Sequence, residues 1–181
     1  RPEIVIIAQL TDTHLLSMRN KEEIAQLRAN NLIAAVSVIN SLAPSVDAVI
    51  HTGDISKPET VKMFSKLNCK MLGVFGNNDR IEEGLEETCR ELGFKFREPP
   101  FLTSIDNRKI AIFHEPEFIA NYIKDHPDVD LVLHGHTHRY RQEIIDNIIL
   151  FNPGESAGLL KGKNALGLVD LDNLEIKRIF F

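Results

Sequence analysis

The chain of 181 residues is long enough to form one domain with a substantial buried core, and 43% of its residues are hydrophobic. It contains no run of about 18 apolar residues, the length that a membrane-spanning helix needs. Its two cysteines, Cys69 and Cys89, form no metal-binding or redox motif. We therefore expect a cytoplasmic protein with reduced cysteines and no membrane association. The formal net charge of −5 argues against a broad basic surface that binds nucleic acid.

The first half of the chain alternates short apolar strands with amphipathic helices. Residues 4–10 are a β-branched run without polar alternation, which predicts a strand covered on both faces. Apolar residues spaced three and four apart predict a helix over residues 21–41. The pattern repeats, with strands expected at 46–50 and 71–75 and helices at 61–67 and 81–92. This order is typical of a largely parallel sheet covered by helices.

The second half is richer in expected strands. Residues 101–105 and 109–113 flank a short connection that is typical of a hairpin. A helix is expected at 117–124, and the remaining strands at 130–133, 143–145, 148–151, 165–170 and 175–180. We expect these strands to form a mixed second sheet that packs against the first, within a single domain that spans residues 1–181.

Side chains able to bind a metal ion follow five of the expected strands, at the point where each strand ends. In an open α/β sheet the carboxyl ends of the strands face one crevice, so residues far apart in sequence meet there. We therefore expect a metal site at this edge with seven candidate ligands: Asp12, His14, Asp54, Asn77, His114, His136 and His138.

The segment LHGHTH, residues 133–138, carries three of the seven histidines of the chain. His136 and His138 are two residues apart and should lie on one side of the loop, with Gly135 allowing a sharp turn before them. His134 lies one step inside the strand, so we expect it in the core or behind the ligands.

Each motif also has a purely structural interpretation. Asp54 could cap the helix that follows it, and the segment GNND at residues 76–79 could form a tight turn. The metal site is favoured because the whole set occurs in order, with every member at the end of a strand-like run.

The residue types indicate which ions the site would take. Asp54 has two oxygens and can bridge two ions, which together would activate a water molecule and hold a phosphoryl group. Mixed imidazole, carboxylate and amide ligands suit Mn, Fe, Zn, Ni or Co better than Mg or Ca. The expected cofactors are therefore two divalent transition-metal ions.

The motifs resemble those of a known family. TDTH (residues 11–14), GD (53–54), GNND (76–79), the lone His114 and GHTH (135–138) are similar to the five ordered motifs of the calcineurin-like metallophosphoesterases, and chain length and the NPG at 152–154 are similar to the small YfcE-like phosphodiesterase subfamily. The resemblance implies an α/β (α+β) fold, a four-layer αββα sandwich of two mixed β-sheets flanked by helices.

The resemblance also implies how the ligands divide between two metal ions. Asp12, His14, Asp54 and His138 would hold one ion. Asp54, Asn77, His114 and His136 would hold the other. Asp79 would orient the groups around it.

The function that follows is a two-metal-dependent phosphodiesterase, in which a metal-bridging hydroxide attacks a small phosphodiester substrate. Asn77 and Asn78 would bind the substrate and stabilise the developing charge. Many family members have a histidine where this chain has Asn78, and an asparagine cannot act as a general acid. We therefore expect diesters with good leaving groups to be preferred.

Two other functions fit the same resemblance. The fold could serve as a non-catalytic protein-binding scaffold, as in the retromer subunit that resembles these enzymes, although all seven ligand positions are filled here. A nuclease is the second alternative, which the acidic net charge and the missing capping domain disfavour. Assembly into a homo-oligomer is left open.

Several further residues carry specific expectations. His51 is expected in the core or behind the ligands, and His126 at the solvent-facing surface. Arg80 is expected on a helix surface, paired with Glu82 or Glu83, and Arg139 also at the surface. Glu155 interrupts the NPGS usual in the small subfamily, which leaves open whether this turn contacts the site. Residues 15–21 and 161–163 are expected to shape the rim of the pocket.

Overall fold

The computed structural model describes residues 4–14, 22–158 and 162–181. The expected rim segment 15–21 and residue 161 lie outside this part of the chain. The helical elements are α1 (Glu22–Ser41), α2 (Pro58–Met63), the 3-10 turn η1 (Phe64–Lys66), α3 (Leu85–Glu91) and α4 (Ile119–Asp125). The strands are β1 (Ile6–Leu10), β2 (Ala48–His51), β3 (Lys70–Val74), β4 (Lys95–Arg97), β5 (Phe101–Ile105), β6 (Arg108–Ile112), β7 (Leu131–Leu133), β8 (Arg141–Ile145), β9 (Ile148–Asn152), β10 (Ala165–Asp170) and β11 (Ile176–Phe180).

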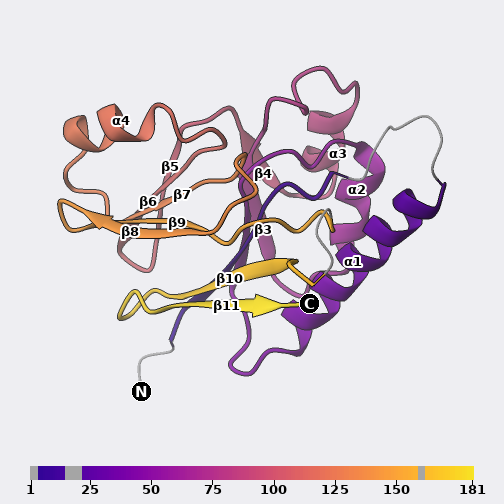
Figure 1. Cartoon of the computed structure of the whole chain (residues 1–181), viewed down its shortest axis with the longest axis horizontal. Helices are drawn as coiled ribbons and strands as arrows, with labels where there is room; N and C mark the ends of the chain where they lie inside the picture. The colour runs from indigo at the N-terminus through magenta and orange to yellow at the C-terminus, as the bar shows by residue number, and fades with distance from the viewer. Residues whose placement is uncertain (1–3, 15–21, 159–161) are drawn as a thin grey trace.

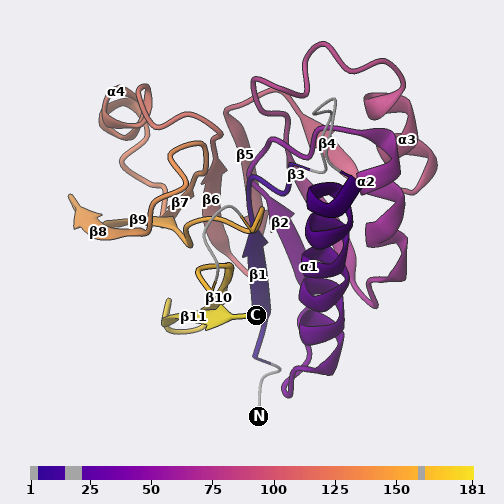
Figure 2. The same ribbon diagram turned by 45° about the vertical axis from the view of Figure 1, so that its right-hand side comes forward.

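Two mixed sheets lie between helices, as the sequence predicts (Figures 1 and 2). The first sheet has the strand order β11-β10-β1-β2-β3-β4, and the second has the order β5-β6-β7-β9-β8. Helices α1, α2 and α3 cover the outer face of the first sheet, and α4 lies beyond the second, which is plain in Figure 2. The arrangement is a four-layer αββα sandwich.

Three hydrophobic cores separate the four layers. The first lies between the helices and the first sheet and includes Ala8, Ala35 and Phe64. The second lies between the two sheets and includes Ile7 and Phe151. A third lies under α4. Because Ile7 and Ala8 are neighbours on β1 yet belong to different cores, this strand is covered on both faces, which explains why its sequence lacks polar alternation.

The last two strands join the first sheet, so their expected place in the second sheet is wrong. β10 pairs antiparallel with β1, with Ile7 opposite Val169, and β11 pairs antiparallel with β10. The alternation of Leu166, which belongs to the first core, and Val169, which belongs to the second, shows that β10 has two faces to bury. The sequence pattern predicts such a strand but does not predict the strand with which it pairs.

Two smaller expectations also change. The expected helix at 81–92 begins only at Leu85, after Gly84 in the left-handed region, and Ile81 is 84% exposed. Residues 95–97, for which the sequence analysis predicted no strand, form the edge strand β4, from which Phe96 packs against the first core. Within the described residues, no helix combines the length and apolar character that crossing a membrane requires.

The core between the sheets predicts a stability difference between two phenylalanines. Phe151 is fully buried against Gly167 of β10, whereas Phe118 is 70% exposed. Phe151→Ala should lower the free energy of unfolding by about 3–5 kcal/mol, because it leaves a cavity between the sheets. Phe118→Ala should change it by about 0.5 kcal/mol or less. Urea denaturation followed by circular dichroism measures both, and equal effects would contradict the layer assignment.

Candidate metal centre

The ends of β1 and β2 are held together beyond the strands themselves. The backbone N–H of Thr52 donates to the carbonyl of Leu10 at 3.0 Å, that of Asp12 to Gly53 at 3.0 Å and that of His14 to Asp54 at 3.1 Å. This extended ladder fixes the Asp12–His14 segment against the segment that carries Asp54. The expected convergence of these strand ends is therefore present in the structure.

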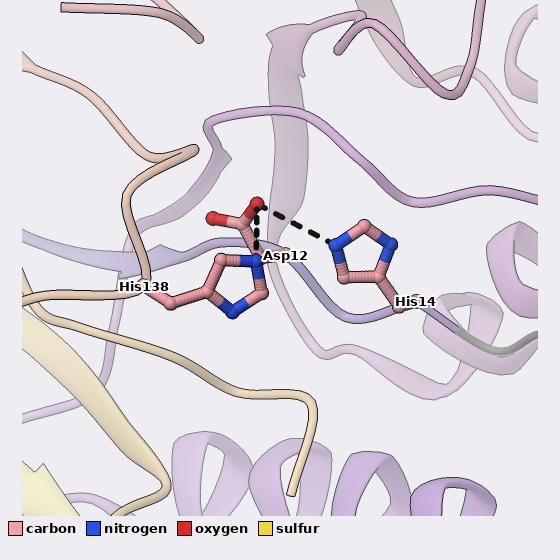
Figure 3. A group of neighbouring side chains, drawn as sticks. All are labelled: Asp12, His14 and His138. Carbon is pink, nitrogen blue, oxygen red and sulfur yellow. Dashed lines mark ion pairs between the residues drawn. The ribbon is translucent and has the colours of Figure 1, made fainter. Parts of the chain in front are cut away.

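Asp12, His14 and His138 form the first ligand group. Oδ1 of Asp12 lies 3.7 Å from Nε2 of His14 and 3.5 Å from Nε2 of His138. Figure 3 shows both imidazoles directed at this one oxygen. The two rings stack with their centroids 5.3 Å apart and 3° between their planes.

The carboxylate of Asp12 provides the test of whether a cation fits this group. Its Oδ2 accepts hydrogen bonds from the hydroxyl of Thr11 at 2.6 Å and the backbone N–H of His136 at 3.0 Å. Its buried Oδ1 has no hydrogen-bond partner in the described part of the chain. The two imidazole nitrogens are too distant for good hydrogen bonds. However, two ligands that share one ion lie roughly 3.4 Å apart in tetrahedral geometry. The donors therefore fit a divalent ion.

Asp54, His114 and His136 form the second group, and Asn77 adds an amide oxygen to it. Oδ2 of Asp54 lies 3.4 Å from Nε2 of His114. Oδ1 of Asn77 lies 2.9 Å from Nε2 of His114 and 3.2 Å from Nδ1 of His136. The structure thus brings all seven candidate ligands together in two groups.

Asp54 lies between the two groups. The same Oδ2 that faces His114 lies 3.5 Å from Nε2 of His14, which belongs to the first group. Asn78 holds the carboxylate from the other side, because its backbone N–H donates to Oδ1 at 3.0 Å and its Nδ2 donates to Oδ2 at 2.8 Å. Asp54 does not cap the next helix, where Lys57 is the N-cap residue.

Oppositely charged neighbours shift the pKa values of the carboxyl and imidazole groups in the site. Burial acts to raise the pKa of Asp54, but His114 and the Asn78 hydrogen bonds outweigh burial and hold this pKa well below its usual range. Burial acts to lower the pKa of His114, but Asp54 and Asp12 raise it to about 9. The pKa of Asp12 is also lowered, because His14 and His138 outweigh its burial. The carboxylates are therefore charged at neutral pH.

Asp79 positions the loops rather than facing the ligand groups. Its carboxylate accepts hydrogen bonds from the backbone N–H groups of Gly76, Ser56 and Ile55, at 2.7, 2.7 and 3.3 Å. Burial raises the pKa of Asp79, although these backbone donors act in the opposite direction. The loops that follow β2 and β3 are thereby joined through one side chain.

The buried histidines behind the ligands are neutral. Burial lowers the pKa of His51 to about 3 and that of His134 to about 4. Nδ1 of His51 accepts from the backbone N–H of Gly53 at 3.2 Å, so its Nε2 carries the proton and donates to the hydroxyl of Thr13 at 3.1 Å. These hydrogen bonds of His51 therefore help to fix the position of the Asp12–His14 segment.

Two surface expectations are wrong in detail. His126 is half-buried and stacks on Tyr122 with the ring centroids 4.1 Å apart, so it does not simply face solvent. Arg80 is exposed but pairs with Glu98 and Glu115. The expected partners Glu82 and Glu83 assumed a helix, and the described helix α3 begins after them.

The turn after β9 contacts the site, which the sequence left open. Nδ2 of Asn152 donates to the carbonyl of Gly135 at 3.1 Å, and Oε2 of Glu155 lies 3.3 Å from Nδ1 of His138. The sequence analysis noted Glu155 only as a departure from relatives. A buried carboxylate beside a ligand histidine could not be identified without knowing that the turn lies against the GHTH loop.

The ligand positions carry an unusual backbone conformation. Positive φ angles occur at Asp12 (51°), His14 (30°), Asp54 (56°), His136 (68°) and His138 (55°). Such angles are uncommon outside glycine, although asparagine, aspartate and histidine adopt them more often than other residues, and they concentrate at functional sites.

Gly135 is needed for a different reason than the sharp turn expected from the sequence. Its φ lies outside the left-handed region, but an added Cβ would collide with the hydroxyl of Thr11.

The sequence profile of the calcineurin-like phosphoesterase superfamily domain matches residues 5–174. The chain belongs to this superfamily. Together with the two ligand groups, this membership makes the protein a metal-dependent phosphoric ester hydrolase. The family resemblance drawn from the five motifs is confirmed.

Relatives extend along nearly the whole chain. Phosphodiesterase MJ0936 of Methanocaldococcus jannaschii is 29% identical over 151 residues, which cover 82% of this chain and 90% of the relative. A solved structure of a novel archaeal phosphodiesterase superimposes with a TM-score of 0.81 at 26% identity, over 98% of this chain and all of the other. Vps29 from Entamoeba histolytica, in a single-mutant form, has a TM-score of 0.64 at 20% identity over 98% of this chain and 99% of its own, and shares the fold.

The pKa of His114 predicts how metal affinity depends on pH. In protein stripped of metal by a chelator, this imidazole is protonated below about pH 9, and an ion can bind only the neutral ring. The apparent affinity for Ni²⁺ should therefore rise as the pH increases from 6.5 toward 9, with proton release. Calorimetry in two buffers of different ionisation enthalpy measures both the Ni²⁺ affinity and the number of protons released.

The stripped protein should show the opposite trend in stability. Because the folded pKa of His114 lies above its ordinary value of 6.5, its stabilising contribution is complete below 6.5 and is lost as the pH rises through about 9. Folded His51 is neutral across this window, so it affects stability only near the lower limit, where the imidazole of the unfolded chain still binds protons. A pH-independent Ni²⁺ affinity would contradict the assignment of His114 as a ligand.

Proposed function

We propose that the protein is a dinuclear metal-dependent phosphodiesterase that acts on small diesters with good leaving groups. The observation that carries the proposal is the position of Asp54, whose Oδ2 lies 3.5 Å from His14 and 3.4 Å from His114. One carboxylate oxygen shared by two ligand groups suits a pair of divalent ions. The name of the relative from Methanocaldococcus jannaschii supports the choice of diesters.

The side chains divide the work between holding ions and holding substrate. Asp12, His14 and His138 would hold one ion, His114, His136 and Asn77 the other, and Asp54 would join the two. Divalent ions bound there supply Lewis-acid stabilisation of the phosphoryl oxygens and an activated water nucleophile. Manganese, iron, zinc, nickel and cobalt suit these ligands.

The asparagines would contact the substrate. An amide that presents its oxygen toward the ligand group, as Asn77 does, retains Nδ2–H donors for a phosphoryl oxygen. Asn78 is exposed beside Asp54 and can donate its second Nδ2–H in the same way. Hydrogen bonds that strengthen as charge develops on the phosphoryl oxygens would lower the barrier.

Asn78 also sets the leaving-group preference. It cannot give a proton to a departing alkoxide at any accessible pH. The leaving oxygen must therefore accept its negative charge with little help, which favours aryl or other acidic leaving groups. Simple alkyl monoesters should be poor substrates.

Removal of a ligand side chain should abolish hydrolysis. His136→Ala and Asp54→Ala should each lower kcat for bis(p-nitrophenyl) phosphate at least about 100-fold, because each breaks a ligand group that supplies several kcal/mol of transition-state stabilisation. His126→Ala removes an imidazole that stacks on Tyr122 away from the ligand groups and should keep full activity. Full activity of both ligand variants in metal-loaded protein would refute the proposal, and a protein that binds metal but hydrolyses no ester would favour the scaffold alternative.

A histidine in place of Asn78 should broaden the substrate range. In the parent protein the rate should fall steeply as the leaving group becomes more basic. Asn78→His adds a general acid, so rates with poor leaving groups should rise about 10-fold or more while rates with p-nitrophenolate change little. A series of substituted phenyl methyl phosphates measures the slope. An identical slope in both proteins would show that Asn78 does not set the preference.

A further inference from the structure

Three ligand histidines share one arrangement. His14, His114 and His138 each direct Nε2 toward a carboxylate and Nδ1 toward a second acceptor. The Nδ1 partners are the hydroxyl of Ser56 at 3.4 Å for His14, the carbonyl of Thr52 at 2.8 Å for His114 and Oε2 of Glu155 at 3.3 Å for His138. Of these three partners, only Glu155 is an ionisable carboxylate.

The fold holds Glu155 firmly in place. The residue is 3% exposed and lies in the connection between β9 and β10. The backbone N–H of Gly154 donates to Oδ1 of Asn152 at 2.9 Å, and Nε of Arg178 donates to the carbonyl of Pro153 at 2.9 Å. The carbonyl of Glu155 itself accepts from Ala165 at 2.9 Å. Both sides of the turn are thus fixed before the side chain reaches His138.

We propose that Glu155 is a positioning residue that orients His138 and strengthens it as a metal ligand. A carboxylate that accepts the Nδ1–H of an imidazole fixes the tautomer with the lone pair on Nε2 and makes that nitrogen a better donor. Here Nε2 of His138 lies 3.5 Å from the buried Oδ1 of Asp12, the atom that points into the first ligand group. The inference rests on the proposed function, because it requires an ion at this group.

Arg28 supports the burial of this carboxylate. Burial lowers the pKa of Arg28, and the charge of Glu155 acts in the opposite direction, so the two charges are close enough to interact. Nη1 of Arg28 also donates to the carbonyl of His14 at 2.9 Å. Helix α1 therefore contributes one cation that offsets Glu155 and fixes the backbone of a second ligand in the same group.

The two ligand groups are consequently unequal. His138 in the first group has a carboxylate behind it, whereas His114 in the second has a neutral backbone carbonyl. A negative charge behind the ligand raises the affinity for a cation. We expect Glu155 to affect one of the two bound ions and to leave the other nearly unchanged.

Titration with Co²⁺ tests this inference without measuring activity. Chelator-treated parent protein should bind two equivalents, followed by calorimetry and by the visible absorption of Co²⁺. Glu155→Gln keeps the size of the side chain and removes the charge, and it should weaken one equivalent about 10- to 100-fold and shift its absorption band. The matched control is Glu115→Gln, which removes a carboxylate that lies 3.8 Å from Arg80, and it should leave both equivalents unchanged.

A second pair of variants tests whether the effect passes through His138. In a His138→Ala background, Glu155→Gln should change Co²⁺ affinity less than about 2-fold. If Glu155→Gln weakens binding equally with and without His138, the inference is wrong, because the effect is then a general disturbance of the fold. Unchanged Co²⁺ affinity and spectrum in Glu155→Gln would overturn it as well. A parent protein that binds no Co²⁺ would instead refute the proposed function.

Discussion

The hydrogen-bonded ladder that continues past the ends of β1 and β2 is the constraint on which the site depends. It fixes the backbone of Asp12 and His14 against that of Gly53 and Asp54. Both carboxylates become buried, and a buried charge is costly unless opposite charges and hydrogen-bond donors surround it. The imidazoles and Asn78 meet this need in part. Oδ1 of Asp12, which has no hydrogen-bond partner among the described residues, is an atom that a bound cation would satisfy.

The surrounding structure holds the ligands in conformations that the chain would not adopt alone. Positive φ angles at five ligand positions are unfavourable locally, so they persist only because the neighbouring contacts are strong. Asp79 joins the loops after β2 and β3 through three backbone hydrogen bonds. His51 braces the Asp12–His14 segment as a neutral ring. These strained conformations lower the folding stability of the protein in exchange for a fixed site geometry, as is usual at functional sites.

Two residues at which the chain departs from the motifs that it resembles lie at different parts of the same candidate centre. Asn78 donates a hydrogen bond to Asp54 and is an amide, which cannot act as a general acid. Glu155 lies behind His138 and adds a negative charge to one ligand group. Asn78 would narrow the range of leaving groups, and Glu155 would strengthen the binding of one ion.

The sequence by itself indicated the family, through the resemblance of its five motifs, as well as the seven ligand candidates and most of the strand-helix order, because apolar periodicity and motif order are local properties of the chain. It did not predict the edge strand β4. It did not determine that β10 and β11 join the first sheet, since an alternating strand records which faces are buried but not its neighbour. Nor did it reveal the contacts of Glu155, Arg28 and His51, although it placed His51 in the core or behind the ligands. Each acts through a contact with a residue distant in the chain, and only the packing of the layers brings the partners within reach.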